Sequence, residues 1–140
     1  MILLDTHVWI WWVQGDSRIP AAFVEFLDRR PAHTTGVSVF SCWEVGMLSA
    51  NGRIKLPCDP VKWTLGSLAY PGVILVPMSP EIAVGASHLP GRFHSDPADR
   101  LLVETARVLN CPIDTSDRQI LAYAFVDALR PDIDFIPLLR

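Results

Sequence analysis

The sequence predicts an α/β fold, a three-layer α/β/α sandwich with a mostly parallel central sheet. Short apolar runs alternate with segments of helical periodicity, which is typical of parallel strands that are joined by helices and covered on both faces. The chain shows no repeat, low-complexity tract or evident linker. Its 140 residues are enough to form one hydrophobic core, so we expect a single domain spanning residues 1–140.

The first part of the chain is expected to supply two strands and three helices. The apolar run ILL is a candidate buried strand, and TTGVSV is the next one. Pro20 favours the start of one helix and Gly52 the end of another, because proline fits the first helical turn and glycine the left-handed turn after a helix. The expected elements are a strand at 2–4, helices at 6–14 and 21–30, a strand at 34–39 and a helix at 41–52.

The remainder continues this alternation of helix and strand. Pro90 and Gly91 break one helix, and Pro97 opens another inside HSDPADRLLVETARVLN. In a parallel sheet of this kind, ligands bind in the crevice beyond the carboxyl ends of the strands. The expected elements are helices at 61–70, 80–89, within 94–110 and at 117–126, with strands at 72–77, 111–114 and 133–138.

Composition narrows the function classes. Half of the residues are hydrophobic and the mean hydropathy is +0.28, yet the apolar runs are far too short to span a membrane. We therefore expect part of the apolar surface to contact a partner. The net charge of -3 excludes a protein that coats nucleic acid through bulk positive charge, so any nucleic-acid contact must be local.

The cysteines and the N-terminus indicate a cytoplasmic protein. Cys42, Cys58 and Cys111 are odd in number, widely scattered and without a CxxC pair, which argues against a disulfide framework or a zinc ribbon. We expect three buried thiols in a reducing compartment. The chain begins with MILLD and shows no basic segment, long apolar stretch and cleavage site of a secretory signal, in agreement with this location.

Two carboxylates, Asp96 and Asp99, fall in the first turn of the helix within 94–110. A purely structural interpretation is available. Ser95 or Asp96 can cap the helix, Asp99 can complete a capping box, and both acids favour the positive end of the helix dipole. The rest of the chain must show whether these acids have another role.

Three further acids occupy equivalent places in the predicted sheet. Asp5 directly follows the first strand, Glu44 lies in the first turn of helix 41–52, and Asp117 follows strand 111–114. Because the strands are parallel, we expect these acids to face one crevice. Each also has a structural alternative: Asp5 can cap the helix that it precedes, and the candidate capping-box pairs are Ser41 with Glu44 and Ser116 with Gln119.

Taken together, the acids predict a metal site. Clustered carboxylates repel one another and raise each other's pKa unless a cation compensates them. A set of carboxylates without paired histidines or cysteines suits Mg²⁺ or Mn²⁺, which bind phosphate oxygens. The matching reaction is hydrolysis of a phosphodiester by metal-activated water, which needs no covalent nucleophile.

Four stretches of the chain now support a resemblance to a known family. LLDTHVWIWW, SVFSCWEV, FHSDPADRLLVETA and TSDRQILAY occur in this order over nearly the whole sequence. Together they resemble the PIN-domain family, specifically the VapC-type toxins of bacterial toxin-antitoxin systems. The resemblance implies a PIN-like α/β/α fold, a Mg²⁺- or Mn²⁺-dependent endoribonuclease, a VapB-like antitoxin as partner and a homodimer.

The resemblance also assigns roles to individual residues. It implies that the catalytic and metal-binding acids are Asp5, Glu44, Asp99 and Asp117, with Asp96 as an additional candidate ligand. By helical spacing, Asp99 shares the inward face of its helix with Leu102, Val103 and Ala106, whereas Asp96 lies at the cap. We expect Asp99 to be the ligand and Asp96 mainly a cap. Thr6 and Thr115 are candidates for orienting a ligand or a metal-bound water, with simple capping or turn hydrogen bonds as the alternative.

Contacts to RNA are expected from basic residues near the acids. Most of the basic residues are arginines, which suit bidentate phosphate contacts and stacking on unpaired bases. Arg92, Arg118 and His94 are the candidate substrate-binding residues, and His94 is also the histidine best placed for a direct catalytic role. Arg100 is expected to neutralise the acids. The sequence leaves the RNA and its cleavage site open, and it does not exclude DNA.

Two other function classes remain. A phosphatase or phospho-acceptor domain would also place an aspartate after the first strand, but the phosphatase pattern needs a second one two residues later, where the chain has His7. Neither Lys55 nor Lys62 follows a late strand, where a phosphate-binding lysine belongs. A non-catalytic interaction module would not need an ordered set of acids, so metal titration distinguishes it from a nuclease.

Overall fold

The computed structural model describes residues 1–132 and contains one parallel five-stranded sheet with the strand order β3-β2-β1-β4-β5. At its centre, Leu3 pairs with Gly36 of β2 on one side and with Ile113 of β4 on the other. The predicted parallel sheet is confirmed. The strand bounds are β1 Ile2–Leu4, β2 Thr35–Ser38, β3 Val73–Val76, β4 Ile113–Asp114 and β5 Ala128–Leu129.

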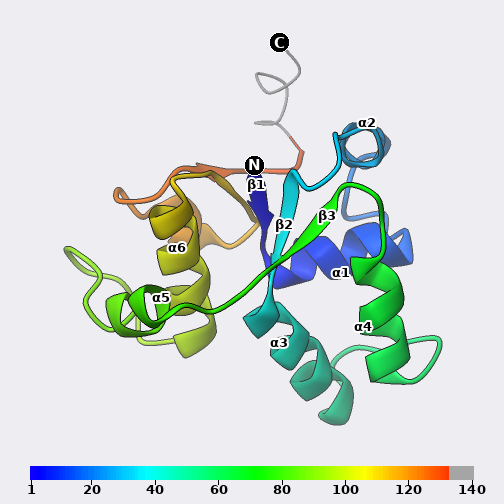
Figure 1. Cartoon of the computed structure of the whole chain (residues 1–140), viewed down its shortest axis with the longest axis horizontal. Helices are drawn as coiled ribbons and strands as arrows, with labels where there is room; N and C mark the ends of the chain where they lie inside the picture. The colour runs from blue at the N-terminus through cyan, green and yellow to red at the C-terminus, as the bar shows by residue number, and fades with distance from the viewer. Residues whose placement is uncertain (133–140) are drawn as a thin grey trace.

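Helices cover both faces of the sheet. In Figure 1, α1, α2 and α4 lie on one side and α5 and α6 on the other. The three-layer arrangement predicted from the sequence is therefore confirmed. The helix bounds are α1 Thr6–Gln14, α2 Ala21–Asp28, α3 Val39–Ala50, α4 Pro60–Leu68, α5 Pro80–Gly85, α6 Pro97–Leu109 and α7 Arg118–Leu121.

The side chains of β1 alternate between two hydrophobic cores. Ile2 and Leu4 pack with residues of the first four helices, among them Trp9, whereas Leu3 packs with Leu102 and other residues of the second layer. Successive residues of a strand point to opposite faces. An entirely apolar run is therefore what a strand covered on both faces requires.

Helix α3 begins two residues before the predicted start, which changes the role of Ser41. Ser38 is the N-cap, and its hydroxyl accepts a hydrogen bond from the backbone N–H of Phe40. Ser41 is buried inside the helix, so the predicted Ser41–Glu44 capping box is wrong, and Glu44 lies in the second turn. The helix ends at Ala50, two residues before the predicted end, and Gly52 after it lies in the left-handed region as expected, with a φ of +70°.

The predicted helix 117–126 is too long, since α7 ends at Leu121. Tyr123 is buried, and its hydroxyl donates to the carbonyl of Pro90, while the carbonyl of Asp127 accepts from the N–H of Ile113 as the chain enters β5. Packing and pairing with β4 thus override local helix propensity. The strand predicted at 133–138 lies outside the described residues.

Smaller differences between the prediction and the structure concern the helix ends and the exposure of the cysteines. The predicted ends of α2, α4 and α5 extend two to four residues too far. Only Cys111 is buried, whereas Cys42 is partly exposed and Cys58 exposed, so the expectation of three buried thiols is wrong. Within residues 1–132, no helix is long and apolar enough to cross a membrane.

Candidate metal centre

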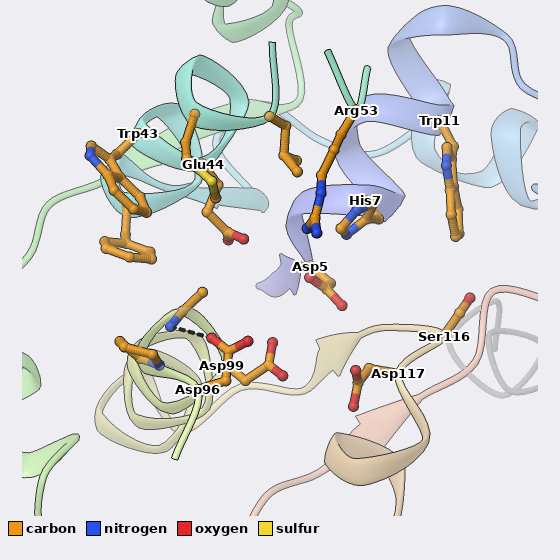
Figure 2. Close-up of a pocket in the computed structure, with 15 residues that line it drawn as sticks. Asp5, His7, Trp11, Trp43, Glu44, Arg53, Asp96, Asp99, Ser116 and Asp117 are labelled. Carbon is orange, nitrogen blue, oxygen red and sulfur yellow. Dashed lines mark hydrogen bonds between the residues drawn. The ribbon is translucent and has the colours of Figure 1, made fainter. Parts of the chain in front are cut away.

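The carboxyl ends of three neighbouring strands lead into one cavity. Strand β1 ends immediately before Asp5, β2 is followed directly by α3, and β4 ends immediately before Thr115. The cavity has a volume of about 720 Å³, in the range typical of ligand pockets. Figure 2 shows acids from four segments of the chain around it, namely Asp5, Glu44, Asp96, Asp99 and Asp117.

Asp5 occupies the N-cap position of α1 but does not act as a cap. Its side chain makes no capping hydrogen bond; instead, the Thr115 hydroxyl donates to Oδ2 over 2.6 Å. Burial raises the pKa of Asp5, and the charge of Asp117 raises it further, whereas the Thr115 hydrogen bond and the charge of His7 oppose this rise. The capping alternative for Asp5 is therefore wrong.

Glu44 is held in the same way by another threonine. Oγ1 of Thr6 lies 2.5 Å from Oε1 of Glu44, to which it donates, and 2.8 Å from Oγ of buried Ser41. Burial, together with repulsion from Asp5 and Asp96, raises the pKa of Glu44 to about 7 despite the Thr6 hydrogen bond. Both threonine hydroxyls singled out in the sequence thus hydrogen-bond to a predicted ligand.

Asp96 and Asp117 act as helix caps. Oδ1 of Asp96 accepts from the N–H of Ala98 at 2.9 Å, and Oδ1 of Asp117 accepts from the N–H groups of Gln119 and Ile120 at 2.9 and 3.0 Å. Asp117, and not Ser116, is the cap of α7, so the predicted Ser116–Gln119 box is wrong. Because the caps use one oxygen of each carboxylate, the other remains available to a cation on the cavity side.

Asp99 does not complete a capping box. The N–H of Asp96, which would be its partner, instead donates to Nδ1 of His94 over 3.3 Å. Nε2 of the same histidine lies 3.0 Å from Oδ2 of Asp99. Burial, followed by repulsion from Asp117, Asp5, Asp96 and Glu44, raises the pKa of Asp99 to about 7.

Among residues 1–132, one close group of possible metal ligands includes a histidine. Single ligand atoms of His94, Asp99 and Asp117 all lie within 4.8 Å of one another. Asp5, Glu44 and Asp96 line the same cavity but are not members of this group. His94 was not predicted to be a metal ligand, because the spacing of the histidines in the sequence is not that of a metal motif.

The basic residues lie differently from the sequence-based expectation. The guanidinium of Arg100 donates to the carbonyls of Ala86, Phe93 and His94, so its expected neutralisation of the acids is wrong. Arg92 and Arg118 are exposed and border separate hollows beside the cavity. The cavity is instead lined by Arg53, which follows α3 and which the sequence analysis missed because no motif marks it.

The donor set fits a hard divalent cation. Within residues 1–132, no lysine or arginine forms an ion pair with any of the five acids, and His94 is their only ion-pair partner. Burial, together with repulsion among these carboxylates, raises the pKa values of Glu44 and Asp99 to about 7. Carboxylate oxygens that lack a compensating charge are the preferred ligands of Mg²⁺ and Mn²⁺.

Fold and sequence comparisons agree with this geometry. The PIN-domain pattern matches residues 2–126, and the chain therefore belongs to the PIN-domain family, as the motifs indicated. Among its relatives, Ribonuclease VapC22 of Mycobacterium tuberculosis is 33% identical over 122 residues, which are 87% of this chain and 91% of that protein.

Two solved structures show the same fold at low sequence identity. VapBC2 from Rickettsia felis bound to a DNA fragment from its promoter matches with a TM-score of 0.68 and 13% identity, covering 93% of this chain and 98% of that one. FitAcB from Neisseria gonorrhoeae matches with a TM-score of 0.63 and 21% identity, covering 95% and 99%. The predicted VapC-type, PIN-like fold is confirmed.

Proposed function

We propose that this VapC-type PIN-domain protein is a metal-dependent endoribonuclease and the toxin of a toxin-antitoxin pair, with the domain spanning residues 1–140. The observation that carries the proposal is the convergence of Asp5, Glu44, Asp96, Asp99 and Asp117 on one cavity at the carboxyl edge of a parallel sheet. Sequence similarity to Ribonuclease VapC22 supports RNA as the substrate.

Each acid has a defined part in the proposed site. Asp5, Glu44, Asp99 and Asp117 hold Mg²⁺ or Mn²⁺, with Asp96 as a fifth, peripheral ligand. The bound ion supplies a water of lowered pKa and positive charge near the phosphate oxygens. Thr115 and Thr6 fix one oxygen of Asp5 and of Glu44, so that the other oxygen of each keeps a constant orientation toward the cavity.

The other polar residues assist at the edges of this site. His94 lies against Asp99 and supplies a positive charge to it when protonated. Arg53 and His7 line the cavity on the side away from Trp43 (Figure 2), where a guanidinium can bind a phosphate of the substrate. Arg92 and Arg118 contact RNA segments that leave the cavity.

The relatives support the proposed partners. The solved structures that share this fold include toxin-antitoxin assemblies, and we propose a VapB-like antitoxin for this chain together with a homodimer in the cytoplasm. Co-expression with the small reading frame beside its gene, followed by size-exclusion chromatography with light scattering, tests both. If the co-expressed small protein never co-purifies with this protein, the antitoxin assignment is contradicted.

RNA cleavage tests the enzymatic proposal. Purified protein, free of any partner, is incubated with total bacterial RNA in Mg²⁺ or Mn²⁺, with EDTA as the metal-free arm. We expect cleavage that EDTA and Asp99→Asn both abolish. Asp59→Asn is the control, because Asp59 is likewise an aspartate at the start of a helix, α4, but does not line the cavity. Equal cleavage by wild type and Asp99→Asn would reject the proposed site.

A further inference from the structure

We propose that Phe40 and Trp43 form a stacking platform for an unpaired base of the RNA, beside the phosphate that is held at the acids. The inference rests on the proposed function and extends it to how the substrate strand is bound. It concerns a pair of aromatic rings on α3, at the rim of the cavity and next to Glu44.

The helical spacing of α3 places these rings at the acidic site. Phe40, Trp43 and Met47 recur at the three- and four-residue spacing that puts side chains on one helical stripe, and all three line the cavity. Glu44 and Leu48 form the adjoining stripe and are buried. One stripe of α3 therefore carries a proposed metal ligand, and the neighbouring stripe carries the rings.

The two rings stack on each other, and the ring of Trp43 is the exposed one. Their centroids are 5.1 Å apart and their planes differ by 30°. Trp43 is 59% exposed, more than any other aromatic side chain among the described residues, whereas Trp9, Trp12 and Trp63 are at most 6% exposed. Core packing explains those three buried tryptophans and leaves the exposure of Trp43 unexplained.

An RNA base is the occupant that fits this position. A phosphodiester at the acids brings the bases of its own nucleotides to the walls of the same cavity, which Phe40 and Trp43 line. Figure 2 shows Trp43 at the edge of this cavity, beside Glu44. Stacking on aromatic side chains is the usual way in which proteins hold unpaired bases, and it requires no net positive charge. Arg53 lines the same cavity at some distance along it from Trp43 (Figure 2), and its guanidinium suits the phosphate backbone.

Binding measurements can test the platform separately from cleavage. Every protein carries Asp99→Asn to prevent hydrolysis, and fluorescence anisotropy in Mg²⁺ gives its affinity for labelled oligoadenylate and for an abasic strand of equal length. Adding Trp43→Ala should weaken oligoadenylate binding about 5- to 100-fold, the range for loss of a base-stacking side chain. The abasic strand should bind both proteins equally, and Trp43→Tyr should restore oligoadenylate binding.

The control variants distinguish base stacking on the Trp43 ring from apolar contact of any other kind. Trp43→Leu keeps apolar volume without a ring face, so we expect it to bind as weakly as Trp43→Ala. Tyr70→Ala removes an exposed ring that lines neither this cavity nor the hollows of Arg92 and Arg118 and should leave oligoadenylate binding unchanged. Melting temperatures of the Trp43 variants should agree with that of the Asp99→Asn protein, because Trp43 is exposed.

Several results would overturn the platform. Full binding by Trp43→Leu would show that only apolar volume matters, and an equal loss with the abasic strand would show that no base is contacted. Dissociation of a dimer or of an antitoxin complex by Trp43→Ala, with RNA binding intact, would assign the rings to a protein interface. The absence of any RNA binding would also reject the platform. Failure of the wild type to cleave RNA, with ring-dependent binding preserved, would instead reject only the proposed enzymatic function.

Discussion

The acidic cavity is built differently on its two sides. Asp5 and Glu44 are buried and held by threonine hydroxyls, whereas Asp96 and Asp117 cap helices through backbone N–H groups. A cap stabilises its helix whether or not a metal is present. A buried carboxylate with a raised pKa lowers stability unless a cation compensates it, so Asp5 and Glu44 are the better indicators of function.

Asp99 connects the two sides. Like the caps, it lies in the first turn of a helix, but it forms no capping box and its pKa is raised to about 7, as for Glu44. Four other acids contribute to that rise after burial. Asp99 is therefore the residue at which cation binding should relieve the most repulsion.

The largest effect is expected from Asp5→Asn. The amide can still accept the Thr115 hydrogen bond, but one negative charge of the site is lost. We expect RNA cleavage to fall by about 1,000-fold or more, since a metal contributes several kcal/mol to transition-state stabilisation. The melting temperature without metal should stay the same or rise. Initial rates and thermal melts check this result, and near-normal rates would remove Asp5 from the site.

A smaller effect is expected when the orientation of Glu44 is disturbed. Thr6→Val keeps the shape of the side chain but removes the hydroxyl that donates to Glu44. We expect Mn²⁺ affinity to fall about 10- to 100-fold, as for other groups that orient metal ligands. Thr6→Ser restores the hydroxyl and should recover most of the affinity. If Thr6→Val binds Mn²⁺ normally, then Thr6 serves only the packing of α1 against α3.

Substitutions of the helix cap Asp96 should affect the stability of the protein and its RNA cleavage separately. Asp96→Asn preserves the hydrogen bond to the N–H of Ala98 and should leave the melting temperature unchanged while cleavage falls by less than about tenfold. Asp96→Ala removes the cap and should lower the free energy of unfolding by about 1 kcal/mol. A loss of activity in Asp96→Asn as large as in Asp5→Asn would make Asp96 an essential ligand.

The smallest effect is a pH dependence of stability without metal. The folded-state pKa values of Glu44 and Asp99 are raised to about 7, whereas unfolded carboxyls titrate near pH 4. The folded protein thus binds more protons between these values, and its stability falls as the pH rises through this window. We expect the melting temperature to be about 5 °C lower at pH 8 than at pH 5. Mn²⁺ should reduce this difference, and a metal-free protein that is more stable at pH 8 would contradict the charge balance described for the cavity.

Much of the fold was predictable because apolar patterns and caps are local signals. The run ILL marks β1, and the bounds of α1 at Thr6 and Gln14 agree with the prediction. The end of α7 was not predictable, because it depends on the burial of Tyr123 against residues distant in sequence. Strand β5 contains only two residues and is defined by its pairing with β4.

The site was predictable as a set of acids but not in its internal contacts. Motif order and strand ends indicated the five carboxylates, and the structure places all five around one cavity. The contact of His94 with Asp99 depends on the fold of the loop before α6, and the place of Arg53 depends on the end of α3. Local sequence carries no signal for either contact. The position of Asp5 before a helix suggested a cap, but its side chain makes no capping hydrogen bond.

The most direct test of the central claim is calorimetric titration of Mn²⁺ into the wild type, Asp99→Asn and the control Asp59→Asn. The claim is that the acids of this cavity form a metal centre and are not merely helix caps. We expect the wild type and Asp59→Asn to bind Mn²⁺ alike, and Asp99→Asn to bind at least about tenfold more weakly. No binding to the wild type, or equal binding by all three proteins, would contradict the claim.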